Sequence, residues 1–282
     1  MSLRIESYAA LTAAQCAEIE ALQRAVYTAE GLQNTAWLSN EINFDRSIPC
    51  FFLGYEDDIL AAFLTLFLPT REEGEVVAFT ALADRHKGYF TALLNAAKDT
   101  LRQYGVPRLL FAVEAKSTEG LRYLQKHFPF AEHSHTEWRM RCVPEKYVLP
   151  DHISAVRVTA KTAKDYASVV LEEYGGDEAA VMQRLQAENR TTYLVRDGDM
   201  PVGVFAFAQG EALTLFGVVV ADSVRGKGYG NALLQAALNI ACETGKDVEL
   251  DVDSENPSAL HLYRKYGFQP VFEVQYWRAE IG

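Results

Sequence analysis

The stretch RGKGYGNALL, residues 225–234, decides the fold, because it joins a strand to a helix through three alternating glycines. Residues 213–220 (LTLFGVVV) before it are apolar and β-branched, as expected of a buried strand. Apolar residues at helical spacing follow it to about Glu243. Glycines let backbone N–H groups approach an oxyanion, and a helix N-terminus adds unpaired N–H groups and positive dipole potential. The stretch therefore predicts a cradle for a phosphate or pyrophosphate, although a flexible loop that merely begins a helix is equally compatible with it.

Two nucleotide-binding motifs fit this stretch poorly. A P-loop requires GxxxxGK followed by Ser or Thr, and the chain lacks that pattern here. A dinucleotide-binding fold places GxGxxG directly after its first strand. Asn231 stands where the third glycine belongs, and five residues separate Val220 from Gly226. Nucleotide binding at this loop is therefore a weaker hypothesis than binding of another pyrophosphate.

The same stretch occurs twice in the chain. Residues 85–94 (RHKGYFTALL) align with residues 225–234 at an offset of 140 (225 − 85), and seven of the ten positions are identical. Gly105 and Gly245 recur at the same offset. The 282 residues are also about twice the ~150 of a typical domain. The sequence thus predicts an internal repeat of two domains.

We expect the first domain at residues 1–142 and the second at 154–282, with a linker at 143–153 that contains two prolines. Each copy should be an α/β domain of the α+β type, in which helices flank a mixed, mostly antiparallel twisted sheet. In the second copy the patterns predict strands at 155–158, 191–195, 202–208, 213–220, 248–252 and 272–277, and helices at 161–171, 177–188, 228–243 and 257–266.

The composition excludes several other classes. Lys+Arg 27 against Asp+Glu 38 gives a net charge of -11, so we expect no nucleic-acid partner. The longest apolar stretch, residues 59–68, is far shorter than the ~20 residues that span a bilayer, and the N-terminus lacks the apolar region of a signal peptide. We expect no membrane partner and a cytoplasmic location. Four cysteines without a CxxC pair predict reduced thiols. Among the six histidines only His133 and His135 have a metal-ligand spacing, which a surface strand explains equally well, so we expect no metal site.

Two motifs together resemble a known family. Residues 225–230 match the signature Arg/Gln-x-x-Gly-x-Gly/Ala, and the C-terminal pattern combines residues 250–252 (LDV), Asn256, residues 262–263 (LY) and residues 267–268 (GF). These motifs resemble the GNAT superfamily of acyl-CoA-dependent N-acetyltransferases, well over about residues 155–282 and in outline over the first half. The resemblance implies two tandem GNAT-like domains and transfer of an acetyl group from acetyl-CoA to a primary amine by direct attack.

The resemblance also implies roles for individual residues. The backbone amides of the loop would hold the CoA pyrophosphate, and pantetheine would run along the strand edge at Val218 and Val220. Tyr263 would protonate the departing thiolate, and Asn256 would contact the cofactor near its acetyl group. Tyr263 packed in the core, and Asn256 as a helix N-cap, are the alternatives. The expected loop residues are Arg225, Gly226, Lys227, Gly228, Tyr229 and Gly230.

The acceptor amine must lose a proton, and carboxylates are the candidate bases. Glu249, Asp251 and Asp253 alternate along one predicted strand and share one face. Asp251 precedes Tyr263 by twelve residues, which matches the glutamate base of the family's protein N-terminal acetyltransferases. Asp251 is therefore the expected base and Glu211 the second choice, while a solvated acidic face or a water molecule as base remain open.

The first copy differs where the chemistry would take place. His86 and Phe90 replace Gly226 and Gly230, and side chains there would occupy the room that a pyrophosphate needs. Offset 139 brings Ala112, Ser117 and Leu124 to the positions of Asp251, Asn256 and Tyr263, whereas offset 140 brings Tyr123 to Tyr263. We therefore expect a degenerate first domain beside an active second one, a tandem arrangement that resembles mycothiol synthase.

The acceptor stays open in the sequence. Acidic residues at 172–173 and 177–178 flank two glycines and could attract a cationic amine, or simply charge a helix terminus. The expected partner is a small-molecule or peptide amine, with the oligomeric state undetermined. The rival hypothesis is a non-catalytic module that senses acyl-CoA or binds a protein partner.

Overall fold

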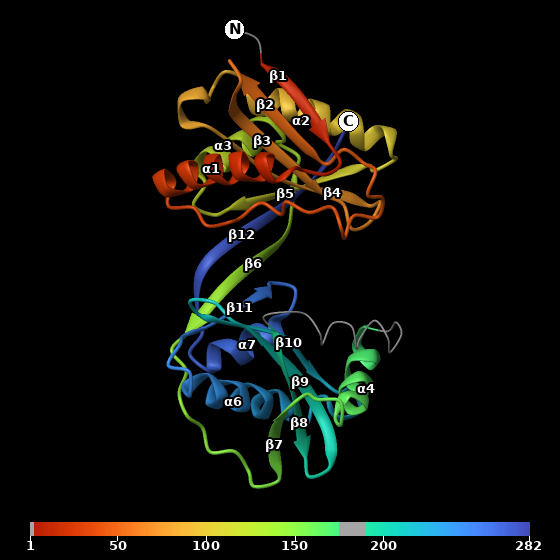
Figure 1. Cartoon of the computed structure of the whole chain (residues 1–282), viewed down its shortest axis with the longest axis vertical. Coiled ribbons are helices and arrows are strands. Elements are labelled where there is room, and N and C mark those ends of the chain that lie inside the picture. Colours follow the sequence, from red (N-terminus) through yellow and green to blue (C-terminus); the bar gives the residue numbers. More distant parts are fainter. Residues whose placement is uncertain (1–2, 175–189) are drawn as a thin grey trace. The chain divides into compact units, whose positions relative to one another are not determined.

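The computed structural model describes residues 3–174 and 190–282. They divide into two compact units, Met1–Glu137 with Phe272–Gly282 and Trp138–Val271 (Figure 1). The expected helix at 177–188, and with it Asp177 and Glu178, lies outside the described residues.

The first unit is a sheet of strand order β1-β2-β3-β4-β5-β12 that is covered by helices. Only β4 and β5 pair in parallel among its neighbours. Thr12 and Gln15 form a capping box at the start of α1, and Gly31 ends that helix at φ +68°. The elements are β1 (Arg4–Tyr8), α1 (Ala13–Glu30), β2 (Phe51–Glu56), β3 (Ile59–Phe67), β4 (Glu73–Thr80), a 3-10 turn (Leu82–Asp84), α2 (Tyr89–Gln103), β5 (Arg108–Glu114), α3 (Thr118–His127) and β6 (Glu132–Cys142), with β12 (Gln269–Glu280) from the C-terminal end.

The second unit repeats this order of elements. Its sheet runs β7-β8-β9-β10-β11-β6, and β10 and β11 pair in parallel. Figure 1 shows α6 and α7 on one face of this sheet and α4 on the other. The elements are β7 (Ile153–Arg157), α4 (Ala163–Tyr174), β8 (Arg190–Asp197), β9 (Met200–Ala208), β10 (Leu213–Val220), a 3-10 turn (Asp222–Val224), α6 (Tyr229–Cys242), β11 (Val248–Asp253) and α7 (Pro257–Lys265).

The expected fold class is confirmed, because each unit has a mixed, mostly antiparallel sheet between helices. The core of the second unit forms where β9 is buried beneath helices on both faces, with Phe205 and Leu233 among its fully buried side chains. Gly203 makes this packing close, since a Cβ there would lie 2.5 Å from the Val219 carbonyl oxygen. Close packing against the sheet therefore fixes the position of α6 and of the loop that precedes it.

The two units exchange their last strands, which differs from the expected boundaries. Strand β12 pairs antiparallel with β5 from Val274↔Glu114 to Glu280↔Arg108, so residues 272–282 belong to the first unit rather than to a domain of residues 154–282. Conversely, residues 138–142 of β6 lie in the second unit, where β6 is the neighbour of β11. Alternation of side chains predicts a strand but not the edge that it joins, so the sequence pattern is the same for both pairings.

No helix in the described part of the chain, residues 3–174 and 190–282, has both the length and the apolar character needed to cross a membrane.

Candidate functional site

The centre of the second unit is a divergence between β10 and β11. The two strands pair at Leu213↔Val248 and Thr214↔Glu249, where the register recorded between them ends. A bulge in β10 then interrupts its register with β9 between Phe216 and Val219, and Gly217 adopts φ +58° inside it. The bulge re-aims the strand. From Gly217 to Val220, β10 has no pairing with β11, and we call this unpaired stretch the gap between the two strands. Val218 and Val220 are half-buried there.

The loop after β10 has the backbone that the glycine pattern predicts. Gly226 and Gly228 adopt φ +75° and +90°, which L-residues rarely occupy, and a Cβ at either position would meet no heavy atom within 4 Å. Gly228 is the N-cap of α6, and among the described residues no side chain caps this terminus and no acidic residue lies in its first turn. The Asn231 N–H donates to the Gly228 carbonyl oxygen at 3.0 Å, and no side chain of the described residues takes up the other N–H groups of the first turn.

The two cations of the loop are exposed. The Arg225 guanidinium donates to the Val220 carbonyl oxygen (3.2 Å) and pairs with Asp222 (2.9 Å). Lys227 donates to the Ser223 carbonyl oxygen at 3.1 Å, and no carboxylate within the described ranges pairs with it. The loop thus keeps positive charge beside an uncapped helix N-terminus.

The other two loop residues fix α6 in place. Gly230 lies where a Cβ would be 3.3 Å from Leu262, so its hydrogen allows α6 and α7 to approach closely. The Tyr229 hydroxyl donates to Asp197 at 2.5 Å. Both contacts are within the second unit, so Tyr229 and Gly230 also hold the loop in position.

Tyr263 and Asn256 lie on α7 and at its start. Tyr263 is 9% exposed and belongs to the core with Leu250 and Val252, its ring 5.7 Å from that of Phe268. Asn256 accepts a hydrogen bond from the Ala259 amide at 3.0 Å and is the N-cap of α7. The N-cap alternative for Asn256 is therefore observed, and a role toward a cofactor would come in addition to it.

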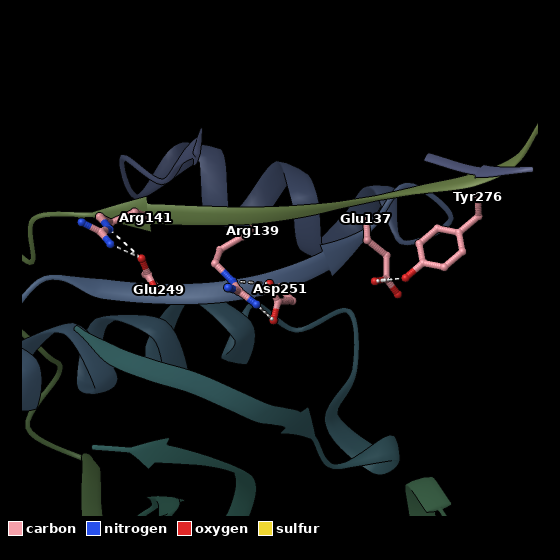
Figure 2. Close-up of polar contacts among 6 residues, drawn as sticks. All are labelled: Glu137, Arg139, Arg141, Glu249, Asp251 and Tyr276. Atoms are coloured by element: carbon pink, nitrogen blue, oxygen red, sulfur yellow. Dashed lines mark hydrogen bonds and ion pairs between the residues drawn. The ribbon is translucent and has the colours of Figure 1, made fainter. Parts of the chain in front are cut away.

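The carboxylates of β11 lie on the face opposite its buried residues. Asp251 is exposed, and both of its oxygens accept from the Arg139 guanidinium of β6, at 3.0 and 3.3 Å (Figure 2). This bidentate contact raises the pKa of Arg139. Glu249 forms the equivalent ion pair with Arg141. Since Tyr263 packs with the opposite face of β11, the structure places Asp251 and Tyr263 on two sides of one strand.

Glu211 stands apart from these residues. It is exposed and precedes Leu213, whereas the glycine loop follows Val220 at the other end of β10. At about 3.3 Å per residue, the strand separates Glu211 from the loop by more than 20 Å.

The first unit keeps the loop's backbone but not its charge. His86 and Gly88 adopt φ +63° and +84° before α2, as Gly226 and Gly228 do before α6. Both loop cations are neutralised by carboxylates of the protein. Arg85 donates to both oxygens of Glu30 (2.6 and 2.8 Å), and Lys87 pairs with Glu56 and Asp84 (2.8 Å each).

Of the two acidic partners of Lys87, only Glu56 has an acidic counterpart in the second unit. Val224 stands in place of Asp84. Asp197 ends β8 opposite Met200 as Glu56 ends β2 opposite Ile59, and it accepts from the Tyr229 hydroxyl. In addition, β4 pairs with β3 without a register shift, so the first unit lacks a bulge of the kind found in β10. These differences agree with the expectation that the first copy is degenerate.

Two residues of the site, Gly217 and Arg139, lie outside the sequence motifs. A glycine inside a strand pattern is a known sign of a bulge, so Gly217 could be found from the sequence. Arg139 offers no such sign, because its partner Asp251 lies 112 residues away.

Comparisons with known proteins agree with this geometry. Residues 159–268 match the model of the Acetyltransferase (GNAT) family. A streptothricin acetyltransferase of Streptomyces lavendulae is 34% identical over 101 residues, which are 34% of this chain and 53% of the relative. The chain thus spans about half the length of this curated relative.

Two solved structures resemble nearly the whole chain. A GCN5-related N-acetyltransferase from Sphaerobacter thermophilus has a TM-score of 0.75 at 21% identity and covers 99% of this chain and 96% of its own. A tandem GNAT protein from the clavulanic acid biosynthesis pathway has a TM-score of 0.73 at 16% identity, with coverage of 100% and 99%. At these identities the likeness establishes the fold, which is two GNAT-like domains in tandem.

Proposed function

Since residues 159–268 form a domain of the GNAT acetyltransferase family, we propose that the second unit transfers an acetyl group from acetyl-CoA to a primary amine by direct attack. The observation that carries this proposal is the uncapped N-terminus of α6 behind Gly226 and Gly228. Its free N–H groups, with Lys227 beside them, fit the pyrophosphate of CoA.

The residues 225–230 would hold the pyrophosphate, chiefly through backbone amides. The pantetheine arm would lie along β10 at Val218 and Val220, where the divergence from β11 leaves a strand edge that an extended amide chain can join. Acetyl-CoA would supply a thioester carbonyl that is activated toward an amine. The gap between β10 and β11 is then the place where donor and acceptor meet.

The positions of Tyr263 and Asp251 support separate acid and base roles on the two sides of β11. Tyr263, on the α7 side, would donate its hydroxyl proton to the departing thiolate. Asp251, on the opposite face, would take the proton of the incoming amine, directly or through water. Arg139 uses one lone pair on each oxygen of Asp251, so a second lone pair stays available for the proton, while the positive charge of Arg139 opposes protonation of the carboxylate. Asn256 would contribute from the N-terminus of α7.

The acceptor would be a small molecule or a peptide that bears an amine. The net charge of -11 favours a cationic acceptor by electrostatic attraction. The relative named streptothricin acetyltransferase supports a small molecule before a peptide.

A matched pair of substitutions tests the proposal. Gly228→Glu places a carboxylate against the bound pyrophosphate and should abolish acetyl-CoA binding in titration calorimetry. Gly88→Glu makes the same change at nearly the same φ, +84° against +90°, and should leave the affinity unchanged. Thiol release from acetyl-CoA with a panel of amines then measures turnover. Equal loss of affinity in both variants would indicate two working sites, and binding without turnover on any amine would favour an acyl-CoA sensor.

A further inference from the structure

The first unit contains a cavity of about 500 Å³ where β4 and β5 diverge. Their parallel register runs from Glu73↔Arg108 to Val76↔Phe111, and residues 76–80 and 111–114 beyond that point line the cavity together with the loop before α2. This is the place that corresponds to the gap of the second unit.

The cationic groups of this cavity are mostly neutralised. Arg85 is paired with Glu30, and Arg122 is paired with Glu119. Lys126, the remaining lining cation, is exposed to solvent. Phe90 stands in the position of Gly230 in the second unit, beside the helix N-terminus. Of the Lys and Arg residues that line the cavity, only the exposed Lys126 therefore lacks a carboxylate partner among the described residues, and the Phe90 ring stands beside the helix N-terminus.

Aromatic rings make up much of the wall. The lining rings are Tyr27, Phe79, Tyr89, Phe90, Phe111 and Tyr123. The Phe90 and Tyr123 rings meet edge to face with their centroids 4.6 Å apart, which gives that part of the wall a fixed shape. The faces of aromatic rings carry negative potential and attract organic cations.

Glu114 supplies a carboxylate to the same cavity. Its side chain is 5% exposed, and its Oε2 accepts from the Gln33 and Asn34 amides at 2.7 and 3.1 Å. Its Oε1 is buried and has no hydrogen-bond donor among the residues that the structure describes. A buried carboxylate oxygen without a donor lowers the free energy of unfolding, so a group kept only for stability would normally have a partner. Because Oε1 exposes less than 1 Å² to solvent, an N–H group of a ligand in the cavity reaches it only when the neighbouring lining side chains shift.

We propose that the cavity of the first unit binds an organic ammonium ion, whose N–H group donates to Glu114 and whose carbon body packs against the aromatic wall. The ion replaces the missing donor of Oε1 and compensates the carboxylate's charge. The first unit then holds a cation site, whereas the loop of the second unit would hold an anion. The proposal rests on Glu114 and the aromatic rings and does not depend on the function proposed for the second unit.

Calorimetric titration of the full chain tests this, with phenethylammonium as the probe and phenethyl alcohol as its uncharged counterpart. We expect the ammonium ion to bind at least about tenfold more tightly than the alcohol, a difference of about 1.4 kcal/mol. Glu114→Gln should lower the affinity for the ammonium ion at least about tenfold. The glutamine oxygen can still accept from Gln33 and Asn34, so the fold is kept.

Two further variants locate the effect. Asp99→Asn removes an exposed carboxylate of α2 outside the cavity and should leave the affinity unchanged. Phe90→Leu removes one ring and should weaken binding several-fold. The proposal is overturned if neither probe binds, if Glu114→Gln binds as the original chain does, or if the Gly228→Glu chain still binds acetyl-CoA and phenethylammonium displaces it.

Discussion

Left-handed backbone is shared by the two glycine loops, but the residues that adopt it differ. Gly226 has open space before it, whereas His86 carries a side chain at φ +63°, a conformation that costs a non-glycine residue about 1 kcal/mol. The two loops therefore have the same turn and differ in the side chains that they carry.

Tyr263 is the residue whose proposed role is easiest to isolate. Tyr263→Phe removes only the hydroxyl, so acetyl-CoA affinity should persist while kcat falls by ~10²-fold, the usual scale for a lost general acid. Tyr266→Phe is the matched control. Tyr266 is the C-cap of the same helix, α7, and its hydroxyl donates to the Asn231 side chain in the first turn of α6; its removal should leave kcat unchanged. Steady-state kinetics with an active amine would measure both, and undiminished kcat in Tyr263→Phe would exclude the acid role.

Asp251 is held by Arg139, so its role as a base depends on that ion pair. Asp251→Asn should lower kcat with little change in acetyl-CoA affinity, and the deficit should shrink as pH rises toward the pKa of the acceptor amine, because neutral amine then needs no base. Glu249→Gln, from the neighbouring ion pair with Arg141, is the control and should have normal kcat.

Arg139→Gln completes this test by leaving the Asp251 carboxylate free of its partner. Its kcat should equal or exceed that of the original chain if Asp251 accepts the proton. A pH-independent deficit in Asp251→Asn together with a similar deficit in Arg139→Gln would instead mean that the pair positions β11.

Glu75 of the first unit makes stability depend on pH. Burial and the neighbouring Glu137 and Glu73 carboxylates raise its pKa to about 7, above its ordinary value of 4.5. The folded chain therefore binds more protons than the unfolded chain between these values, and the free energy of unfolding falls as pH rises through about 7. Glu75→Gln should stabilise the first unit at pH 8 by about 1–3 kcal/mol and have little effect below pH 4.5.

Urea denaturation at a series of pH values would measure this change. Glu72→Gln, an exposed glutamate near the start of the same strand, is the control and should follow the original chain at every pH. A constant difference between Glu75→Gln and the original chain would contradict the raised pKa.

The bulge of β10 is the element that distinguishes the second unit's gap. Gly217 adopts φ +58° there, which a β-branched residue avoids. Gly217→Val should remove or strain the bulge at a cost of about 2 kcal/mol and lower acetyl-CoA affinity at least about tenfold. Gly217→Asn, whose side chain tolerates positive φ, should retain more of both stability and affinity.

Thermal unfolding and calorimetry on the two Gly217 variants would separate stability from binding. The first unit gives a second comparison, because Val77 occupies the corresponding position of β4, where the register with β3 is unbroken. If Gly217→Val bound acetyl-CoA normally, the bulge would not be needed to hold the pantetheine arm.

At the scale of the whole molecule, the exchange of β6 and β12 means that the C-terminal residues 272–282 belong to the first unit. Val274 is 3% exposed on β12 and packs with Val77 and Leu110 of the first unit. Val274→Asp should therefore destabilise the first unit by about 3 kcal/mol or more, because it buries an unpaired charge. Val271→Asp, three residues earlier on the same strand and 37% exposed, should be tolerated.

Hydrogen exchange would show where the Val274→Asp damage falls. Amides of β5 (Arg108–Glu114), the partner of β12, should lose protection, while those of β9 (Met200–Ala208) should keep theirs. Loss of protection in β9 instead would assign the C-terminal strand to the second unit, as the repeat in the sequence predicts.

The sequence by itself determined the repeat, the fold class and the strand–loop–helix unit around residues 213–242. These are local properties: β10 has the bounds that its apolar run predicts, and the positive φ of Gly226 and Gly228 follows from glycines that precede a helix. Residues close in the chain are in contact regardless of the rest of the molecule, so the local sequence pattern is sufficient to predict these elements.

Only the tertiary structure decided the exchange of the last strands, the ion pair that holds Asp251 and the neutral loop of the first unit. Each depends on partners far apart in the chain, such as Arg139 and Asp251 at a separation of 112 residues, or Arg85 and Glu30 at 55. The pattern of a strand does not predict which strand pairs with it, and a charged residue does not predict its ion-pair partner, because the packing of the whole sheet determines both.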